Sequence, residues 1–268
     1  MILGAMKAAT TSLYRWLQAT GLVAMPDLKE PNFFTQEWSR GQDWYLSMFD
    51  GIPLGIPAGE ASVSYSDPNL SRLAAERIHD LLPEERFVFI ARHPIDRLRS
   101  HFRHEVQRHR EKRPFSIAVS SLDSPYVQRS MYGRGLQPYF SLFTPSHILM
   151  IDFNDLIDGE GFGRVLDHLG LPQVKRPDDA HNVTATKRRY TPLARWLFEI
   201  GWTEPLGRMP RFLRQFGRSI GTRHDAGYET ALKESQSAAV PEHVVAALRT
   251  DVVVLESICG IRFDWELG

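Results

Sequence analysis

The chain has 268 residues, 43% of them hydrophobic, and its 32 basic and 32 acidic side chains give a formal net charge of zero. A balanced charge argues against a nucleic-acid binder that relies on overall positive charge. The single cysteine, Cys259, excludes an intrachain disulfide and is typical of a reducing compartment.

Apolar residues alternate between strand-like and helix-like periods along the chain. In chain order the pattern predicts a strand at 1–4, helices at 11–19 and 71–82, a strand at 86–91, a helix at 95–110, a strand at 147–153, and helices at 161–172 and 241–258. Such alternation predicts an α/β fold with a mainly parallel central sheet and helices on both faces. We predict one domain over 1–268, in which the irregular stretch 175–235 forms a lid or an acceptor-side insert.

The ends of the chain and its apolar runs bear on location. No apolar run reaches the roughly 18 residues that a membrane-spanning helix needs. No basic-then-apolar leader precedes the first strand, so we predict a cytoplasmic protein. The first strand is short, which indicates that the natural start lies upstream or that a few residues have been trimmed.

The first strand leads directly into a turn and a helix in "ILGAMKAATTSLYRWL" (2–17). The first N–H groups of a helix have no partner within it, and the helix dipole adds positive potential there. Lys7 adds a charge, while Thr10, Thr11 and Ser12 add hydroxyl donors. The stretch therefore predicts an anion site, with an ordinary turn and a surface lysine as the alternative.

The spacing of this loop differs from that of a Walker A loop. Lys7 follows Gly4 after only three residues, and Ala9 stands where a second glycine would be. A shorter loop surrounds fewer phosphates. We therefore expect a nucleotide held by a single 5′-phosphate rather than by a triphosphate.

A second stretch, "FVFIARHPIDRLRSHF" (87–102), places Arg92 at the carboxyl end of a buried strand and Ser100 two turns into the next helix. The carboxyl ends of parallel strands share one edge of a sheet, where ligands bind. We therefore expect Arg92 and Ser100 to reach the edge that carries Lys7 and to bind a second phosphate. A surface salt bridge of Arg92 is the alternative.

Six blocks together resemble, in order, the sulfotransferases that use 3′-phosphoadenosine 5′-phosphosulfate (PAPS), and most closely the bacterial members related to heparan-type enzymes. The blocks are "GAMKAATTSLYRWL" (4–17), "LKEPNFF" (28–34), "GEASVSY" (59–65), "IARHPIDRLRSHF" (90–102), "RGLQPYFSLFTPSHILMIDFNDLI" (134–157) and "DVVVLESICGIRFDW" (251–265).

This resemblance implies a P-loop-like three-layer fold and transfer of a sulfuryl group from PAPS, leaving PAP, to a hydroxyl or amine. It implies that Lys7 contacts the bridging and leaving oxygens and that no metal is needed. The other implied cofactor residues are Ala8, Ala9, Thr10, Thr11 and Ser12 for the 5′-phosphosulfate, and Arg92 and Ser100 for the 3′-phosphate.

The resemblance also implies a base. Glu30 in "LKEPNFF" stands where heparan-type enzymes carry a catalytic glutamate, and a carboxylate there can take the proton of an acceptor hydroxyl. Lys29 would pair with Glu30 or line the acceptor site. His93, His101 and His104 are alternative bases. The acceptor is expected to be a carbohydrate or a small metabolite.

The sequence departs from the family pattern at three positions. Ala9 replaces a glycine, which is tolerated if its φ is negative. Ala61 replaces a lysine, and Val63 replaces a proline. Glu60 would orient Lys7 or the acceptor, or act as a buried cap for a neighbouring loop.

Two further stretches allow two interpretations each. In "TKRRY" (186–190), Arg188 or Arg189 would bind the 3′-phosphate or form a solvated turn. The segment 195–221 would form two short helices packed on the domain, with contact to a membrane surface as the alternative. For the whole chain, the rival functions are an ATP-dependent phosphotransferase and a degenerate member that binds nucleotide or glycan without turnover.

Overall fold

The computed structural model describes residues 1–177 and 226–267. Contacts divide the chain into two compact units, one of 1–98, 119–182 and 240–268, the other of 99–118 and 183–239. Each unit is described by itself, and the single domain stays a prediction. The predicted insert 175–235 lies mostly outside the described residues.

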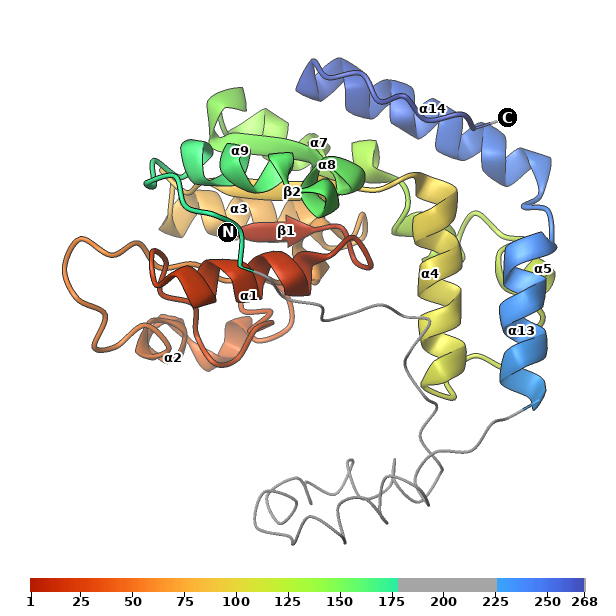
Figure 1. Ribbon diagram of the computed structural model, residues 1–268, viewed down its shortest axis with the longest axis horizontal. Helices are drawn as coiled ribbons and strands as arrows, with labels where there is room; N and C mark the ends of the chain where they lie inside the picture. The colour runs from red at the N-terminus through yellow and green to blue at the C-terminus, as the bar shows by residue number, and fades with distance from the viewer. Residues whose placement is uncertain (178–225, 268) are drawn as a thin grey trace, which may run out of the picture. The chain divides into compact units, whose positions relative to one another are not determined.

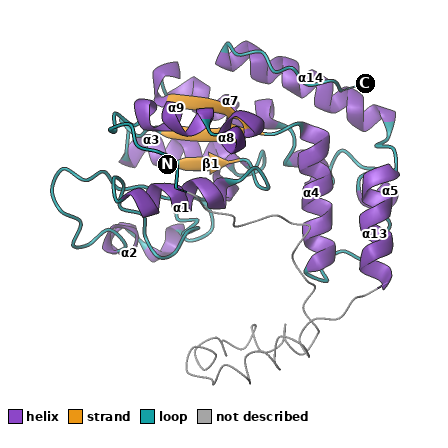
Figure 2. Ribbon diagram, in the orientation of Figure 1, coloured by secondary structure: helices purple, strands orange, loops and turns teal. Residues whose placement is uncertain are grey.

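The first unit is built on a three-stranded parallel sheet in the order β1-β2-β3 (Figure 2). The strands are β1 (Ile2–Gly4), β2 (Phe87–Ala91) and β3 (Ile148–Asp152). All three predicted strands are confirmed, and the parallel pairing is as expected. On the outer side of β1, the amide of Ile2 donates to the carbonyl of Glu60 at 2.8 Å.

Helices connect these strands (Figure 1). The first unit contains α1 (Thr10–Thr20), η1 (Trp38–Arg40), α2 (Gln42–Ser47), η2 (Val63–Ser66), α3 (Ser71–Leu81), α6 (Pro125–Gln128), α7 (Tyr132–Leu142), η3 (Pro145–His147), α8 (Phe153–Asp158), α9 (Glu160–His168) and α14 (Glu242–Cys259). Helix α4 (Pro94–Gln107) begins in the first unit and continues into the second, which also holds α5 (Phe115–Ala118) and α13 (Ala226–Ser237).

Both faces of the sheet are covered, as β2 shows. All five of its residues are buried, and successive side chains of a strand point to opposite faces. Phe87 and Phe89 pack against α7, with Phe87 5.3 Å from the Tyr139 ring and Phe89 5.4 Å from the Tyr132 ring. A contact between Trp16 of α1 and Phe162 of α9, 6.0 Å between ring centroids, joins two helices that the sequence separates.

Helix α7 was not predicted as a helix, yet it anchors the C-terminal part of the first unit. Helix α14 packs along it. The carboxylate of Asp251 in α14 accepts the amides of Gly133 and Arg134 at 2.8 and 2.9 Å, at the start of α7. A Cβ on Gly133 would lie 2.5 Å from the Asp251 carbonyl, so this close approach requires glycine.

The tail that follows α14 returns to the carboxyl end of the sheet. The indole Nε1 of Trp265 donates to Asp152 Oδ2 at 3.0 Å, where β3 ends. His93, just after β2, contacts the Glu266 carbonyl at 3.1 Å. The terminal block of the sequence is therefore part of the edge where the first and fourth blocks meet.

In the second unit, Arg99 of α4 ties the helix to α13. Its guanidinium donates to the carbonyls of Ser235 and Ala238 and lies over the ring of Phe115. Phe102 packs edge-on against the same ring at 5.2 Å. No helix in the described ranges combines the length and the apolar character that crossing a bilayer requires.

Candidate active site

The loop after β1 turns sharply before α1 begins. Lys7 has φ of 72° and Ala9 has φ of 63°. The condition under which alanine would be tolerated at position 9, a negative φ, is therefore not met, because the chain enters α1 through a left-handed residue at the N-cap. A left-handed conformation costs a residue with a Cβ about 1–2 kcal/mol, so a glycine, as in the family pattern that this loop resembles, would be favoured there.

The start of α1 is open to an anion. No side chain caps it, so its first N–H groups and its dipole point toward the loop. Thr10 and Ser12 are buried and Thr11 is half-buried. A Cβ on Gly4 would lie 2.6 Å from Ser66 Oγ, and this hydroxyl donates to the Leu3 carbonyl at 2.8 Å.

Arg92 reaches this loop from β2. Its Nη1 donates to the carbonyl of Lys7 at 3.0 Å, and its guanidinium lies over the Phe153 ring, 4.5 Å from the centroid. The phenol of Tyr132 donates to the Arg92 carbonyl at 2.9 Å. The two cations that the sequence assigns to two phosphates thus lie at the same sheet edge.

Two further arginines near this edge were not assigned from the sequence. Arg97 is fully buried and its Nε donates to Ser130 Oγ at 2.9 Å. Burial lowers the pKa of Arg97 to about 10, so it stays charged at neutral pH. Arg129 pairs with Asp67 at 2.8 Å and donates to the sulfur of Met6 in the loop at 3.3 Å. The second arginine of "RHPIDR" could have indicated Arg97, whereas no sequence signal marked Arg129.

The remaining predicted phosphate ligands are untested. Ser100 is buried on α4 within the second unit, and its binding role stays a prediction. Arg188 and Arg189 lie outside the described residues, as does the segment 195–221.

Glu30 lies in a turn whose other side chains are mostly buried. Its carboxylate pairs with Lys29 at 2.6 Å, and its side chain is 40% exposed. The side-chain amide of Asn32 donates to the Glu30 carbonyl at 2.9 Å. Phe33 and Phe34 are fully buried, and Phe33 stacks on Tyr45 with centroids 4.7 Å apart. A buried aromatic anchor thus presents an accessible carboxylate, and the Lys29 pairing is present.

Glu60 is 1% exposed. Ser62 Oγ and Tyr65 OH each donate to its carboxylate at 2.7 Å. Burial raises the pKa of Glu60 to about 7 despite these hydrogen bonds. Both partners belong to the segment that follows Glu60, which fits the buried-cap interpretation.

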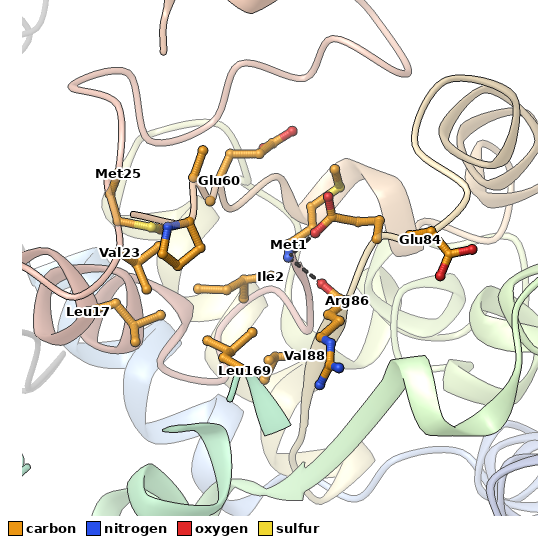
Figure 3. Close-up of a pocket in the computed structure, with 14 residues that line it drawn as sticks. Met1, Ile2, Leu17, Val23, Met25, Glu60, Glu84, Arg86, Val88 and Leu169 are labelled. Atoms are coloured by element: carbon orange, nitrogen blue, oxygen red, sulfur yellow. Dashed lines mark hydrogen bonds and ion pairs between the residues drawn. The ribbon is translucent and has the colours of Figure 1, made fainter. Parts of the chain in front are cut away.

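A cavity of about 310 Å³ lies at the other end of the strands. Figure 3 shows Met1, Ile2, Val88 and Leu169 around it, and these residues begin or precede the strands or follow α9. The cavity is therefore distinct from the loop at the carboxyl edge. Within the described ranges, no group of three or more His, Cys, Asp or Glu side chains could hold a metal ion.

Comparisons with known proteins give the relationship of this chain. No family model matches it. It is 28% identical over 192 residues to human heparan sulfate glucosamine 3-O-sulfotransferase 6, which covers 65% of this chain and 52% of the relative. It is 31% identical over 114 residues to Xenopus laevis bifunctional heparan sulfate N-deacetylase/N-sulfotransferase 1, which covers 39% of this chain and 12% of the relative.

In sequence, the chain is similar to heparan sulfate sulfotransferases. It spans about half the length of the human relative it matches. A solved sulfotransferase from Alicyclobacillus acidocaldarius superposes with a TM-score of 0.65 over 98% of this chain and 95% of that one, at 21% identity. The P-loop-like α/β fold predicted from the sequence is thus confirmed for this chain.

Proposed function

We propose that this chain transfers a sulfuryl group from PAPS to a hydroxyl or amine of a carbohydrate or small-molecule acceptor. The observation that carries the proposal is the hydrogen bond from Arg92 to the Lys7 carbonyl at 3.0 Å. It joins the two sequence blocks that the family uses for two different phosphates. A cytoplasmic location and the lack of a nucleic-acid partner stay predictions from composition.

The residues at the sheet edge fit such a donor. PAPS, when bound, supplies an activated sulfuryl group and a phosphate leaving group. The uncapped start of α1 offers N–H donors to the 5′-phosphate, with Thr10, Thr11 and Ser12 adding hydroxyls. We assign the Lys7 ammonium to the leaving oxygen, where it would stabilise the growing negative charge. We assign Arg92, which contacts the same loop through the Lys7 carbonyl, to the 3′-phosphate.

On the acceptor side, Glu30 takes the proton of the attacking hydroxyl. Its carboxylate is partly exposed and so accessible to an acceptor, and Lys29 orients it through their 2.6 Å contact. General-base assistance of this kind contributes about 10²–10⁴-fold to a rate.

The cofactor class is tested by thermal stabilisation with 3′,5′-ADP, 5′-ADP and ATP. A ligand that binds only the folded state raises its stability by RT ln(1 + [L]/Kd). We expect 3′,5′-ADP to raise the Tm most. The preference for 3′,5′-ADP over 5′-ADP should disappear in Arg92→Ala and in Arg92→Gln.

The two Arg92 variants distinguish a role of the Arg92 charge in binding the nucleotide from a role of its hydrogen bond to the Lys7 carbonyl in supporting the loop. Glutamine can still donate to the Lys7 carbonyl but carries no charge, so retention of the preference in Arg92→Gln alone would assign Arg92 to the loop only. Arg86→Gln, at the opposite end of β2, is the matched control and should behave as the wild type. Equal stabilisation by all three nucleotides would contradict a PAPS site and favour a phosphotransferase or a non-catalytic binder.

Turnover is tested with PAPS and a panel of glycan and phenolic acceptors. We expect Glu30→Gln to lower kcat by about 10²-fold or more while 3′,5′-ADP still stabilises the fold. Glu37→Gln is the matched control, because Glu37 has a similarly exposed side chain (43%) and also pairs with a cation, Arg40. Full activity of Glu30→Gln would remove Glu30 as the base.

A further inference from the structure

The turn that carries Glu30 is held by a segment about thirty residues further along the chain. The amide of Ala61 donates to the Lys29 carbonyl at 3.3 Å. The amide of Asn32 donates to Ser62 Oγ at 3.0 Å, and the amide of Phe34 donates to Tyr65 OH at 3.4 Å. Three backbone groups of the turn thus find their partners in the segment 61–65.

The two side chains that accept these amides, Ser62 and Tyr65, both donate to one buried carboxylate, that of Glu60. Ser62 donates to Glu60 Oε2 and Tyr65 donates to Glu60 Oε1, each at 2.7 Å. A hydroxyl has one proton to donate, so the carboxylate fixes the direction of both hydrogen bonds. The oxygens of Ser62 and Tyr65 are thereby turned into acceptors for the two amides of the turn.

We propose that Glu60 is a positioning residue that fixes, through Ser62 and Tyr65, the backbone of the turn from which Glu30 acts. The effect on catalysis by Glu30 rests on the proposed function. The hold on the turn, by which we mean that Ser62 and Tyr65 fix its backbone, does not depend on the proposed function.

Asn32 links the fixed backbone of the turn to Glu30. Its φ of 51° is left-handed, a conformation that asparagine tolerates better than most residues. Its Nδ2 donates to the Glu30 carbonyl at 2.9 Å, and its Oδ1 accepts from Ser64 Oγ at 2.6 Å. Fixing the amide of Asn32 therefore also fixes the position of the Glu30 carbonyl.

The hold is tested by residue-resolved amide hydrogen exchange, which needs no activity. At pH 8, where the Glu60 carboxyl with its pKa of about 7 is mainly ionised, Glu60→Gln leaves one hydroxyl without its acceptor, because the amide nitrogen of glutamine cannot accept. We expect exchange at Asn32 or Phe34, or at both, to rise at least about tenfold. Asp251→Asn, a comparably buried carboxylate on α14, is the control and should leave these two amides unchanged.

Two milder variants keep the test decisive if Glu60→Gln folds poorly. Ser62→Ala should accelerate exchange at Asn32 more than at Phe34, and Tyr65→Phe should do the reverse. Unchanged exchange at both amides in Glu60→Gln, or equal effects of the two hydroxyl variants at both amides, would overturn the proposal.

Kinetics test the consequence for Glu30. A displacement of about 1 Å at a reacting group can cost about 10²-fold, so we expect Glu60→Gln to lower kcat at least about tenfold. The affinity for 3′,5′-ADP should not change.

The double variant tests whether Glu60 acts through Glu30. Adding Glu60→Gln to Glu30→Gln should lower kcat little further, because the base is already absent, and multiplicative losses of kcat would overturn a role through Glu30. A wild type that transfers no sulfuryl group would reject the proposed function, and the exchange data would still decide the hold on the turn.

Discussion

At the scale of single residues, Ala9 combines a left-handed backbone conformation with a side chain that disfavours it. Its φ of 63° begins α1 directly after the loop, and a glycine would adopt this conformation at little cost. The departure from the family pattern therefore affects the stability of the loop more than its shape.

We expect Ala9→Gly to be neutral or to stabilise the fold by up to about 1 kcal/mol, since relief of the left-handed strain exceeds the entropy that glycine adds to the unfolded chain. Ala8→Gly is the matched control: Ala8 is buried and is not left-handed. It should destabilise the fold by about 0.5–1 kcal/mol or more. Urea unfolding measures both, and a loss in Ala9→Gly as large as in Ala8→Gly would contradict the strain.

Two buried carboxyls make stability depend on pH. Burial raises the pKa of Glu60 to about 7 and that of Asp251 to about 6, while carboxyls of an unfolded chain titrate near 4. The folded state thus binds these protons more tightly. Their contribution to stability is complete below about pH 4 and is lost as the pH rises through 6 to 7.

The variant Glu60→Gln removes the larger of these two pKa shifts. Glutamine stays neutral at every pH, so the stability advantage of the wild type over Glu60→Gln should shrink by about 1–3 kcal/mol between about pH 5 and pH 8. The Met1 ammonium and Glu85 also act on Glu60, in opposite directions, so Glu85→Gln is a useful second background. Urea unfolding at the two pH values measures the change, and a constant difference would show that Glu60 does not titrate in this range.

At the scale of elements, Asp251 connects the end of the chain to the middle. Its carboxylate accepts two amides at the start of α7, and α7 in turn covers Phe87 and Phe89 of β2. The block "DVVVLESICGIRFDW" therefore supports the sheet from a distance.

We expect Asp251→Ala to destabilise the fold by about 2–3 kcal/mol, because two buried N–H groups lose a charged acceptor. Asp251→Asn keeps one acceptor oxygen and should cost less. Thr250→Ala on the same helix is the control, since its hydroxyl bonds only within α14. A loss in Asp251→Ala no larger than in the control would show that the α7 amides find another partner.

The elements that the sequence predicted well are those with a clear apolar period. The continuous run "FVFIA" is β2, and Gly21 ends α1 in a left-handed C-cap. Helix α7 was missed because Gly133, Gly135 and Pro138 look like helix breakers. Gly133 is needed for the close contact with α14, and a Cβ on Gly135 would lie 2.4 Å from the Ser66 carbonyl. Contacts between distant segments, which a local pattern does not encode, decide these positions.

The same reason separates the candidate site residues that the sequence indicated from those that only the structure brings to the loop. Lys7, Arg92 and Glu30 belong to compact motifs, so spacing and resemblance pointed to them. Arg129 approaches the loop only through contacts with Asp67 and Met6, more than sixty residues away. The role of Glu60 could not be chosen from the sequence, because a local pattern does not show that its neighbours Ser62 and Tyr65 accept amides of the turn at 29–35.

At the scale of the whole molecule, charge is unevenly distributed. The net charge is zero, yet Lys7, Arg92, Arg97 and Arg129 all belong to the region of the loop, with Asp67 as a paired carboxylate. A nucleotide bound at this edge, as proposed, would therefore meet local positive charge that the total does not reveal.

We expect the Kd for 3′,5′-ADP to rise about tenfold or more from low salt to about 0.5 M salt, since ions screen this local charge. Arg129→Gln should flatten the dependence, whereas Arg86→Gln at the far end of β2 should not. Calorimetric titration measures it. An affinity that is independent of salt would mean that the cations at this edge do not contact the nucleotide.

Because the turn at 29–35 depends on the segment 61–65, evolution or a designer has to exchange the two segments together. A turn transplanted alone from a relative would arrive without the hydroxyls that receive its amides. Recombination between relatives should therefore preserve activity when both segments come from the same parent and lose it when they come from different ones. New acceptor preferences are best sought in libraries that vary the two segments together.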